Sequence, residues 1–174
     1  MIASGSLVVP NSKVVTGADD TFTTFYHGTS ANVVSDIKLQ GIDLSKGSRF
    51  SDFGQGFYLT TSREEALLSA RRLYGNKVDV VTFKVPESEL SNLYSLRFNS
   101  VDANWQDFVK FHKTYGPQDL LHAGDPYDLV SGPLFRRFSG PSKSAIPWAD
   151  RVNQTSIHTP NSVELFNRYM LKTE

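Results

Sequence analysis

The order of apolar and polar positions along the chain predicts a mixture of strands and helices. Short runs of aromatic and β-branched residues, bounded by glycine, proline, asparagine or aspartate, have the composition of β-strands. Such runs lie at residues 22–27, 57–60, 78–85, 93–98, 127–130 and 153–158. The strand at 127–130 is expected to stop before Gly132 and Pro133, because proline cannot donate a hydrogen bond to a sheet.

Four other segments repeat their apolar residues at the spacing of a helix. They are residues 31–40, 62–74, 102–115 and 160–172. The first is expected to begin after Ser30 and to end at Gly41. Ser62 and Glu65 are expected to form a capping box, in which each side chain bonds the other residue's backbone. The chain lacks a regular strand–helix–strand alternation, so the pattern predicts an α+β fold with mixed or antiparallel sheets and flanking helices.

Residues 1–21 are expected to be a leader or linker ahead of one domain at residues 22–174. Glycine, serine, proline and aspartate in this segment separate only short valine pairs. The Pro/Ser/Gly-rich stretch at 139–147 is expected to be a loop. A chain of 174 residues is long enough for one domain with a substantial core.

Composition narrows the classes of function. Lys plus Arg number 18, as do Asp plus Glu, so no overall field draws the protein to nucleic acid or membrane. The absence of cysteine excludes disulfides and thiolate metal sites, and the four histidines have no metal-ligand spacing, so no metal is expected. No apolar stretch approaches the ~20 residues that span a bilayer, so no membrane insertion is expected.

Two segments have residues suited to a dinucleotide. In Tyr26-His27-Gly28-Thr29, glycine allows close backbone approach, and the imidazole offers one donor and one acceptor to ribose hydroxyls. The alternative is a strand-end histidine bonded to a nearby carbonyl.

At residues 52–60, two glycines precede Phe57 and Tyr58. An aromatic face stacked on a cationic heteroaromatic ring, such as nicotinamide in NAD⁺, contributes ~1 kcal/mol or more. The alternative is that Phe57 and Tyr58 simply alternate between the core and the solvent-exposed face of a strand.

A third segment, residues 153–159, places polar side chains at the start of a late strand, where one can reach a ribose. Its alternative is an ordinary edge strand leading to a capped helix.

Taken together, the three segments resemble the diphtheria-toxin-like, His-Tyr branch of the ADP-ribosyltransferases, and most closely its short bacterial polymorphic-toxin domains. The shared motifs are Tyr-His-Gly-Thr (26–29), Asp-Phe-Gly-x-Gly-Phe-Tyr-Leu-Thr (52–60), Tyr-Asp-x-Val-x-Gly-Pro (127–133) and Gln-x-Ser-x-His-Thr (154–159).

The resemblance covers roughly residues 22–170 and implies the split sheets of that family. It also implies a mono-ADP-ribosyltransferase that cleaves NAD at the nicotinamide–ribose bond and transfers ADP-ribose to a protein or RNA. His27 would bond the adenine-side ribose, the Gly28 backbone would hold the nicotinamide amide, and Tyr58 would stack on the nicotinamide. Thr29 and Phe57 complete the expected NAD-binding set.

This sequence differs from the resembled branch at the third catalytic position, where the branch typically has a glutamate. The resemblance places Gln154 at this position, and the short toxin domains are similar in carrying glutamine. An amide can hold a ribose hydroxyl but cannot ionise. Glu164 is the rival candidate, although it is expected in the first turn of a helix, where the helix dipole favours an acid.

Two other functions stay open: an NAD glycohydrolase, and a non-catalytic module that binds NAD or ADP-ribose. The resemblance further implies a secreted effector of interbacterial competition, delivered into the cytoplasm of a target cell and paired with a cognate immunity protein. Arg49 and the arginine pairs at 71–72 and 136–137 are either solvated or form a basic surface for NAD phosphates or an RNA target. The acceptor is expected to be selected by residues 97–126 and 139–150.

Overall fold

The computed structural model describes residues 20–116, 127–148 and 153–173. The expected leader falls almost wholly outside these residues, as do parts of the two segments expected to select the acceptor. Among the described helices, none combines the length and the apolar character needed to cross a membrane.

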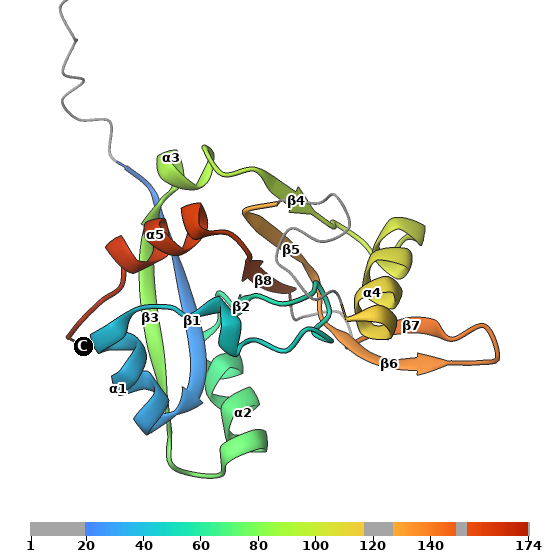
Figure 1. The fold of residues 1–174 in the computed structure, drawn as a ribbon, viewed down its shortest axis with the longest axis horizontal. Coiled ribbons are helices and arrows are strands. Elements are labelled where there is room, and N and C mark those ends of the chain that lie inside the picture. The colour runs from blue at the N-terminus through green and yellow to red at the C-terminus, as the bar shows by residue number, and fades with distance from the viewer. Residues whose placement is uncertain (1–19, 117–126, 149–152, 174) are drawn as a thin grey trace, which may run out of the picture.

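The predicted α+β fold is confirmed, with strands arranged in separate sheets (Figure 1). One sheet pairs β1 (Phe22–Ser30) antiparallel with β3 (Val78–Pro86). A second has the order β2 (Phe57–Leu59), β8 (Asn153–Ile157), β5 (Leu129–Pro133) and β4 (Ser95–Arg97). Only the β4–β5 pair is parallel in this sheet. The strands β6 (Phe135–Ser139) and β7 (Ser144–Pro147) form an antiparallel hairpin.

Four helices lie at the segments predicted from the apolar spacing: α1 (Ala31–Gln40), α2 (Arg63–Tyr74), α4 (Ala103–Tyr115) and α5 (Pro160–Arg168). The short helix α3 (Glu87–Leu90) and a 3₁₀ turn η1 at Leu44–Lys46 were not predicted. Helix α1 has the predicted bounds and ends at Gly41, whose φ of 89° favours glycine. Its N-cap Ser30 makes no side-chain cap bond. Helix α5 ends at Arg168, four residues before the predicted end at 172.

Two apolar clusters form the core, and the loop before β2 connects them. Phe57 belongs to the cluster between β1, β3 and α5, together with Phe83 and Phe166. Phe53 belongs to the cluster around α4 and β5, together with Trp105. Because both ends of the loop are buried in different clusters, the start of β2 is fixed in position.

Two sequence predictions about the chain after residue 130 are wrong. Strand β5 continues through Gly132 to Pro133, which pairs with Asn153 at the last position of the strand, where a missing donor is tolerated. The predicted loop at 139–147 is largely the β6–β7 hairpin. Gly140 and Pro141 occupy the turn. Gln106 of α4 fixes β7 by bonding both backbone groups of Ala145, at 2.6 and 2.7 Å.

An isolated bridge joins strand β1 to the residue that follows strand β2. The Tyr26 amide donates to the Thr60 carbonyl at 2.8 Å, and the Thr60 amide donates to the Tyr26 carbonyl at 3.0 Å. The bridge holds the centre of β1 beside the end of β2. His27 and Tyr58, which lie next to this bridge, are thereby brought together.

Candidate functional site

A cleft of about 380 Å³ opens where β1, β2, β8 and α2 meet. His27 of β1, Tyr58 of β2 and Gln154 of β8 all line it. The structure therefore brings the three residues predicted as catalytic to one site. Gly28, also predicted there, lies in the same wall.

A second cavity of about 530 Å³ adjoins the cleft, because His27 and Tyr58 line both. The remaining predicted NAD-binding residues, Thr29 and Phe57, line this second cavity. Ligand pockets commonly enclose about 300–1,000 Å³. Each of the two cavities has a volume in this range, and His27 and Tyr58 line both.

His27 is held in one orientation. Its Nδ1 lies 2.7 Å from the Tyr58 carbonyl oxygen, which only accepts, so Nδ1 carries the proton and Nε2 is an acceptor. The imidazole stacks on the Phe57 ring, with centroids 4.1 Å apart. Burial lowers the pKa of His27, which favours the neutral ring. His27 therefore makes the bond to a nearby carbonyl that the alternative interpretation expected, and it also lines the cleft. Binding of a ribose by His27 stays a prediction.

Tyr58 offers the cleft its ring, while its hydroxyl is engaged within the protein. The hydroxyl donates to the Gly54 carbonyl at 2.7 Å and accepts from the Phe53 amide at 2.9 Å. Burial raises the pKa of the Tyr58 phenol, so this group is no acid near neutral pH. What Tyr58 can supply is a fixed, partly exposed aromatic surface.

Gln154 contacts a carboxylate that the sequence analysis did not select. Its Nε2 donates to Asp52 Oδ2 at 2.5 Å. The same oxygen accepts from the Phe135 amide at 2.9 Å, and Lys113 Nζ lies 2.8 Å from Asp52 Oδ1. Because Asp52 holds the amide nitrogen, Gln154 Oε1 is the atom left to accept a hydrogen bond from a ligand hydroxyl. In the sequence, Asp52 could have been identified from its position at the start of the 52–60 motif.

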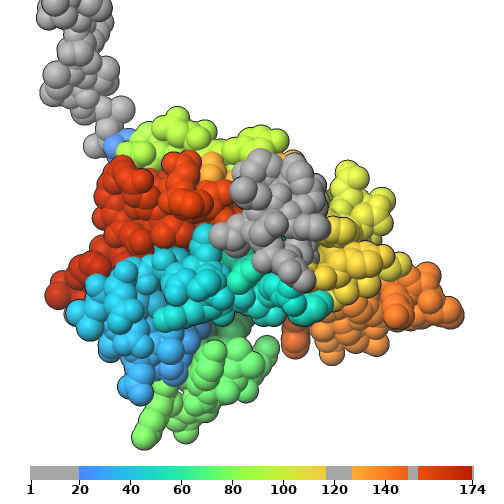
Figure 2. Space-filling model, in the orientation of Figure 1, coloured from blue at the N-terminus to red at the C-terminus, as the bar shows by residue number. Residues whose placement is uncertain are grey.

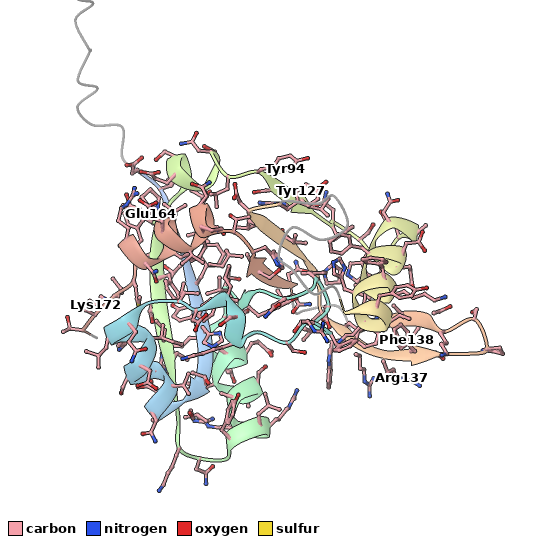
Figure 3. The ribbon with its side chains drawn as sticks, viewed as in Figure 1. Tyr94, Tyr127, Arg137, Phe138, Glu164 and Lys172 are labelled. Atoms are coloured by element: carbon pink, nitrogen blue, oxygen red, sulfur yellow. The ribbon has the colours of Figure 1, made fainter. Side chains whose placement is uncertain are left out.

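Glu164 lies away from this site. It is on α5, its side chain is 76% exposed, and its carboxylate accepts a bond from Arg168 at 3.3 Å. Figure 3 shows the labelled Glu164 at the outer side of α5, apart from β2 and β8. Of the two candidates for the third position, the structure places Gln154 in the cleft.

Residues 23–135 match the family described as protein of unknown function, DUF3990. The chain belongs to this family. The DUF3990 match includes His27, Asp52 and Tyr58, and Gln154 lies beyond its end. No curated protein matches the chain.

A second unpredicted carboxylate lines the DUF3990 cleft. The expected capping box is only half formed: Ser62 Oγ accepts from the Glu65 amide at 3.3 Å, but the Ser62 amide donates to Thr60 Oγ1 at 3.2 Å. The Glu65 side chain instead lines the cleft, with no ion pair or hydrogen bond to another described residue. Within the described residues no three histidine, aspartate or glutamate side chains are grouped to hold a metal ion.

The glycines of the segments at 26–29 and 52–60 are required by close packing within the protein. A Cβ on Gly28 would lie 2.0 Å from the Ala66 carbonyl oxygen, so glycine lets α2 pack directly on β1. A Cβ on Gly54 would lie 2.7 Å from the His112 ring, and one on Gly56 would lie 2.7 Å from the His158 ring. Gly54 and Gly56 therefore allow close approach of the backbone to the protein's own imidazoles.

His158 anchors the loop before β2. Its Nδ1 donates to the Gln55 carbonyl at 2.9 Å, so its Nε2 accepts from Ser156 Oγ at 2.6 Å. Burial lowers the pKa of His158 to about 4. A neutral His158 thus ties β8 to the loop that carries Asp52.

The stability of this DUF3990 protein is expected to fall as the pH is lowered from about 6.5 toward 4. The unfolded His158 binds a proton near its ordinary pKa of ~6.5 and the folded one only near pH 4, so acid favours unfolding. The loss amounts to about 2 kcal/mol at pH 5, and burial of His27 acts in the same direction. Urea unfolding between pH 7.5 and 4.5 measures it. His158→Gln should flatten the pH profile, and an unchanged profile would contradict this explanation.

Proposed function

We propose that this protein is a mono-ADP-ribosyltransferase that cleaves NAD⁺ at the nicotinamide–ribose bond and transfers ADP-ribose to a cellular target. One observation carries the proposal: His27, Tyr58 and Gln154, distant in sequence, line the same cleft. The adjoining cavity, lined by Thr29 and Phe57, supports a ligand of dinucleotide size.

The side chains of the cleft are suited to this reaction. The fixed Tyr58 ring offers a stacking surface to nicotinamide, and His27 Nε2 offers an acceptor to a ribose hydroxyl. Gln154 Oε1 would accept from the 2′-hydroxyl of the other ribose. The glycosidic C–N bond breaks, neutral nicotinamide leaves with the bonding electrons, and the acceptor attacks the same carbon and loses its proton. The site must therefore stabilise positive charge on the sugar.

Glu65 is the carboxylate best placed to supply that stabilisation. Asp52 is compensated by Lys113 at 2.8 Å, whereas Glu65 is unpaired among the described residues and lines the cleft. Glu65→Gln is expected to lower NAD⁺ cleavage by about tenfold or more, because a negative charge is lost from the cleft. Glu64→Gln, in the same helical turn and exposed, is the matched control. Equal rates of nicotinamide release from both variants would exclude the role of Glu65.

We further propose that the protein acts as a secreted effector in the cytoplasm of a target cell, with an immunity protein that blocks the cleft beside Tyr58. This part rests on the resemblance to polymorphic-toxin domains. Induced expression in a bacterium should arrest growth, and co-expression of a neighbouring open reading frame should rescue it. Growth unaffected by an enzyme active in vitro would argue against the toxin role.

An assay in two arms tests the activity and its alternatives. The protein is incubated with etheno-NAD⁺ alone, then with cell lysate and labelled NAD⁺. Label on protein or RNA supports the transferase, and fluorescence without lysate supports the glycohydrolase. No reaction in either arm, with NAD⁺ binding retained, supports the non-catalytic module.

A further inference from the structure

We infer that a surface formed by Arg72, Arg136 and Trp148 binds single-stranded nucleic acid at the mouth of the cleft. The inference rests on the proposed function in one respect only, in that it identifies this nucleic acid as the acceptor. Binding itself needs neither NAD⁺ nor catalysis. The Arg72–Arg136–Trp148 surface is built from three separate elements, α2, β6 and the residue after β7.

Two guanidinium groups lie over one indole. The guanidinium carbons of Arg72 and Arg136 are each 5.1 Å from the Trp148 ring centroid, so they lie no more than about 10 Å apart. Both arginines are exposed, and Trp148 is 38% exposed. No carboxylate of the described residues lies within 4.0 Å of either guanidinium. Two like charges within about one Debye length make a local anion-binding surface on a chain of balanced total charge.

A break in the hairpin sets the direction of Arg136. Phe135 pairs with Pro147 and Arg137 pairs with Ile146, so Arg136 occupies an irregularity in the register. Such bulges redirect side chains at the edges of sheets. The backbone of Trp148 is also fixed, because its amide donates to the Leu134 carbonyl at 2.8 Å. Arg137, labelled in Figure 3, also projects from the hairpin.

The surface adjoins the cleft. Leu134 and Phe135 line the cleft, and Arg136 follows them directly in β6. Ser69 of α2 also lines it, and Arg72 lies one helical turn further along. Helix α2 (green) and the β6–β7 hairpin (orange) both reach the molecular surface in Figure 2. A ligand on this surface would therefore reach into the cleft with one of its groups.

The chemistry of the surface favours unpaired bases and phosphates over an acidic peptide. Guanidinium groups bind phosphate through paired N–H donors and also stack on bases. Aromatic and arginine planes are the usual contacts of single-stranded nucleic acid, because every base offers a flat face. In a duplex the flat faces of the bases are stacked on one another and hidden. A peptide carboxylate offers no flat ring face for stacking. The combination of indole and arginine therefore indicates a single strand.

Fluorescence anisotropy with a labelled 20-nucleotide single-stranded RNA, without NAD⁺, tests the inference. The wild type should bind the RNA more tightly than a duplex of the same sequence or a polyglutamate peptide. Trp148→Ala and Arg72→Gln/Arg136→Gln should each weaken binding about tenfold. The plot of the logarithm of the RNA association constant against the logarithm of the salt concentration has a negative slope. In the arginine double variant this slope should be less steep by about 1.4, at ~0.7 per lost phosphate contact. Arg168→Gln, an exposed arginine on α5, is the matched control.

Each outcome decides the inference independently of NAD⁺ cleavage. Tighter binding of polyglutamate than of RNA would overturn it and make the surface a protein-docking site. RNA affinities equal in the wild type and all variants would also overturn it. If the RNA binds as expected but NAD⁺ is not cleaved, the proposed function fails while the binding surface stands.

Discussion

Replacing Gln154 by alanine is expected to lower NAD⁺ cleavage by about 100-fold or more, the usual loss when a preorganised polar group is removed from a transition-state contact. Gln154 Oε1 is the acceptor that would hold the ribose 2′-hydroxyl, since Nε2 is bonded to Asp52 at 2.5 Å. The fold should survive, because Asp52 keeps its bonds to Lys113 and the Phe135 amide. The rate of nicotinamide release measures the effect, and the melting temperature checks the fold.

Glu164→Ala serves as the comparison. Glu164 is exposed on α5 and contacts only a neighbouring exposed arginine among the described residues, so its loss should change the rate less than twofold. A folded Gln154→Ala protein with the wild-type rate, beside an inactive Glu164→Ala protein, would transfer the third catalytic role to Glu164.

Gln154→Glu is expected to impair the protein rather than restore the glutamate typical of the resembled branch. A glutamate in the place of Gln154 would set two carboxylates at the present 2.5 Å contact, where both cannot ionise. The pKa of one carboxyl must then rise, and the strained pair should cost roughly 3 kcal/mol, or about 10 °C in melting temperature. Thermal unfolding at pH 7 measures the loss.

Adding Asp52→Asn to Gln154→Glu should recover part of this stability. The asparagine amide would donate to the new carboxylate, reversing the present bond between positions 52 and 154. Recovery is partial because the Phe135 amide, which now donates to Asp52 Oδ2, can lose its acceptor. A double variant no more stable than Gln154→Glu alone would show that the two positions are not coupled.

Much of the fold could be predicted because its signals are local. The bounds of α1 follow from apolar spacing and Gly41, and the early strands follow from runs of aromatic and β-branched residues. The hairpin at β6–β7 could not be predicted, because Gln106 fixes it from a distant helix. The strand at 127–130 was predicted, but its continuation to Pro133 was not, because it depends on pairing with Asn153 of the distant strand β8.

The candidate site was predictable only in part for a similar reason. His27 and Tyr58 were indicated by the chemistry of their own segments and by a family resemblance, and Gln154 by the resemblance. Only the folded chain shows that the three share a cleft. Asp52 escaped selection because its partners Gln154, Phe135 and Lys113 are all distant in sequence. The sequence pattern of a capping box assigned Glu65 to its own helix, whereas the Thr60 side chain takes its place at the Ser62 amide.

The most direct measurement is a crystal structure with a carbocyclic NAD⁺ analogue whose nicotinamide bond cannot be hydrolysed. Our expectation is that the nicotinamide ring lies on the face of Tyr58, at a stacking distance of ~4–5 Å, with the adenine half in the cavity lined by Thr29 and Phe57. An analogue bound elsewhere on the protein, or no binding at millimolar concentration, would contradict it.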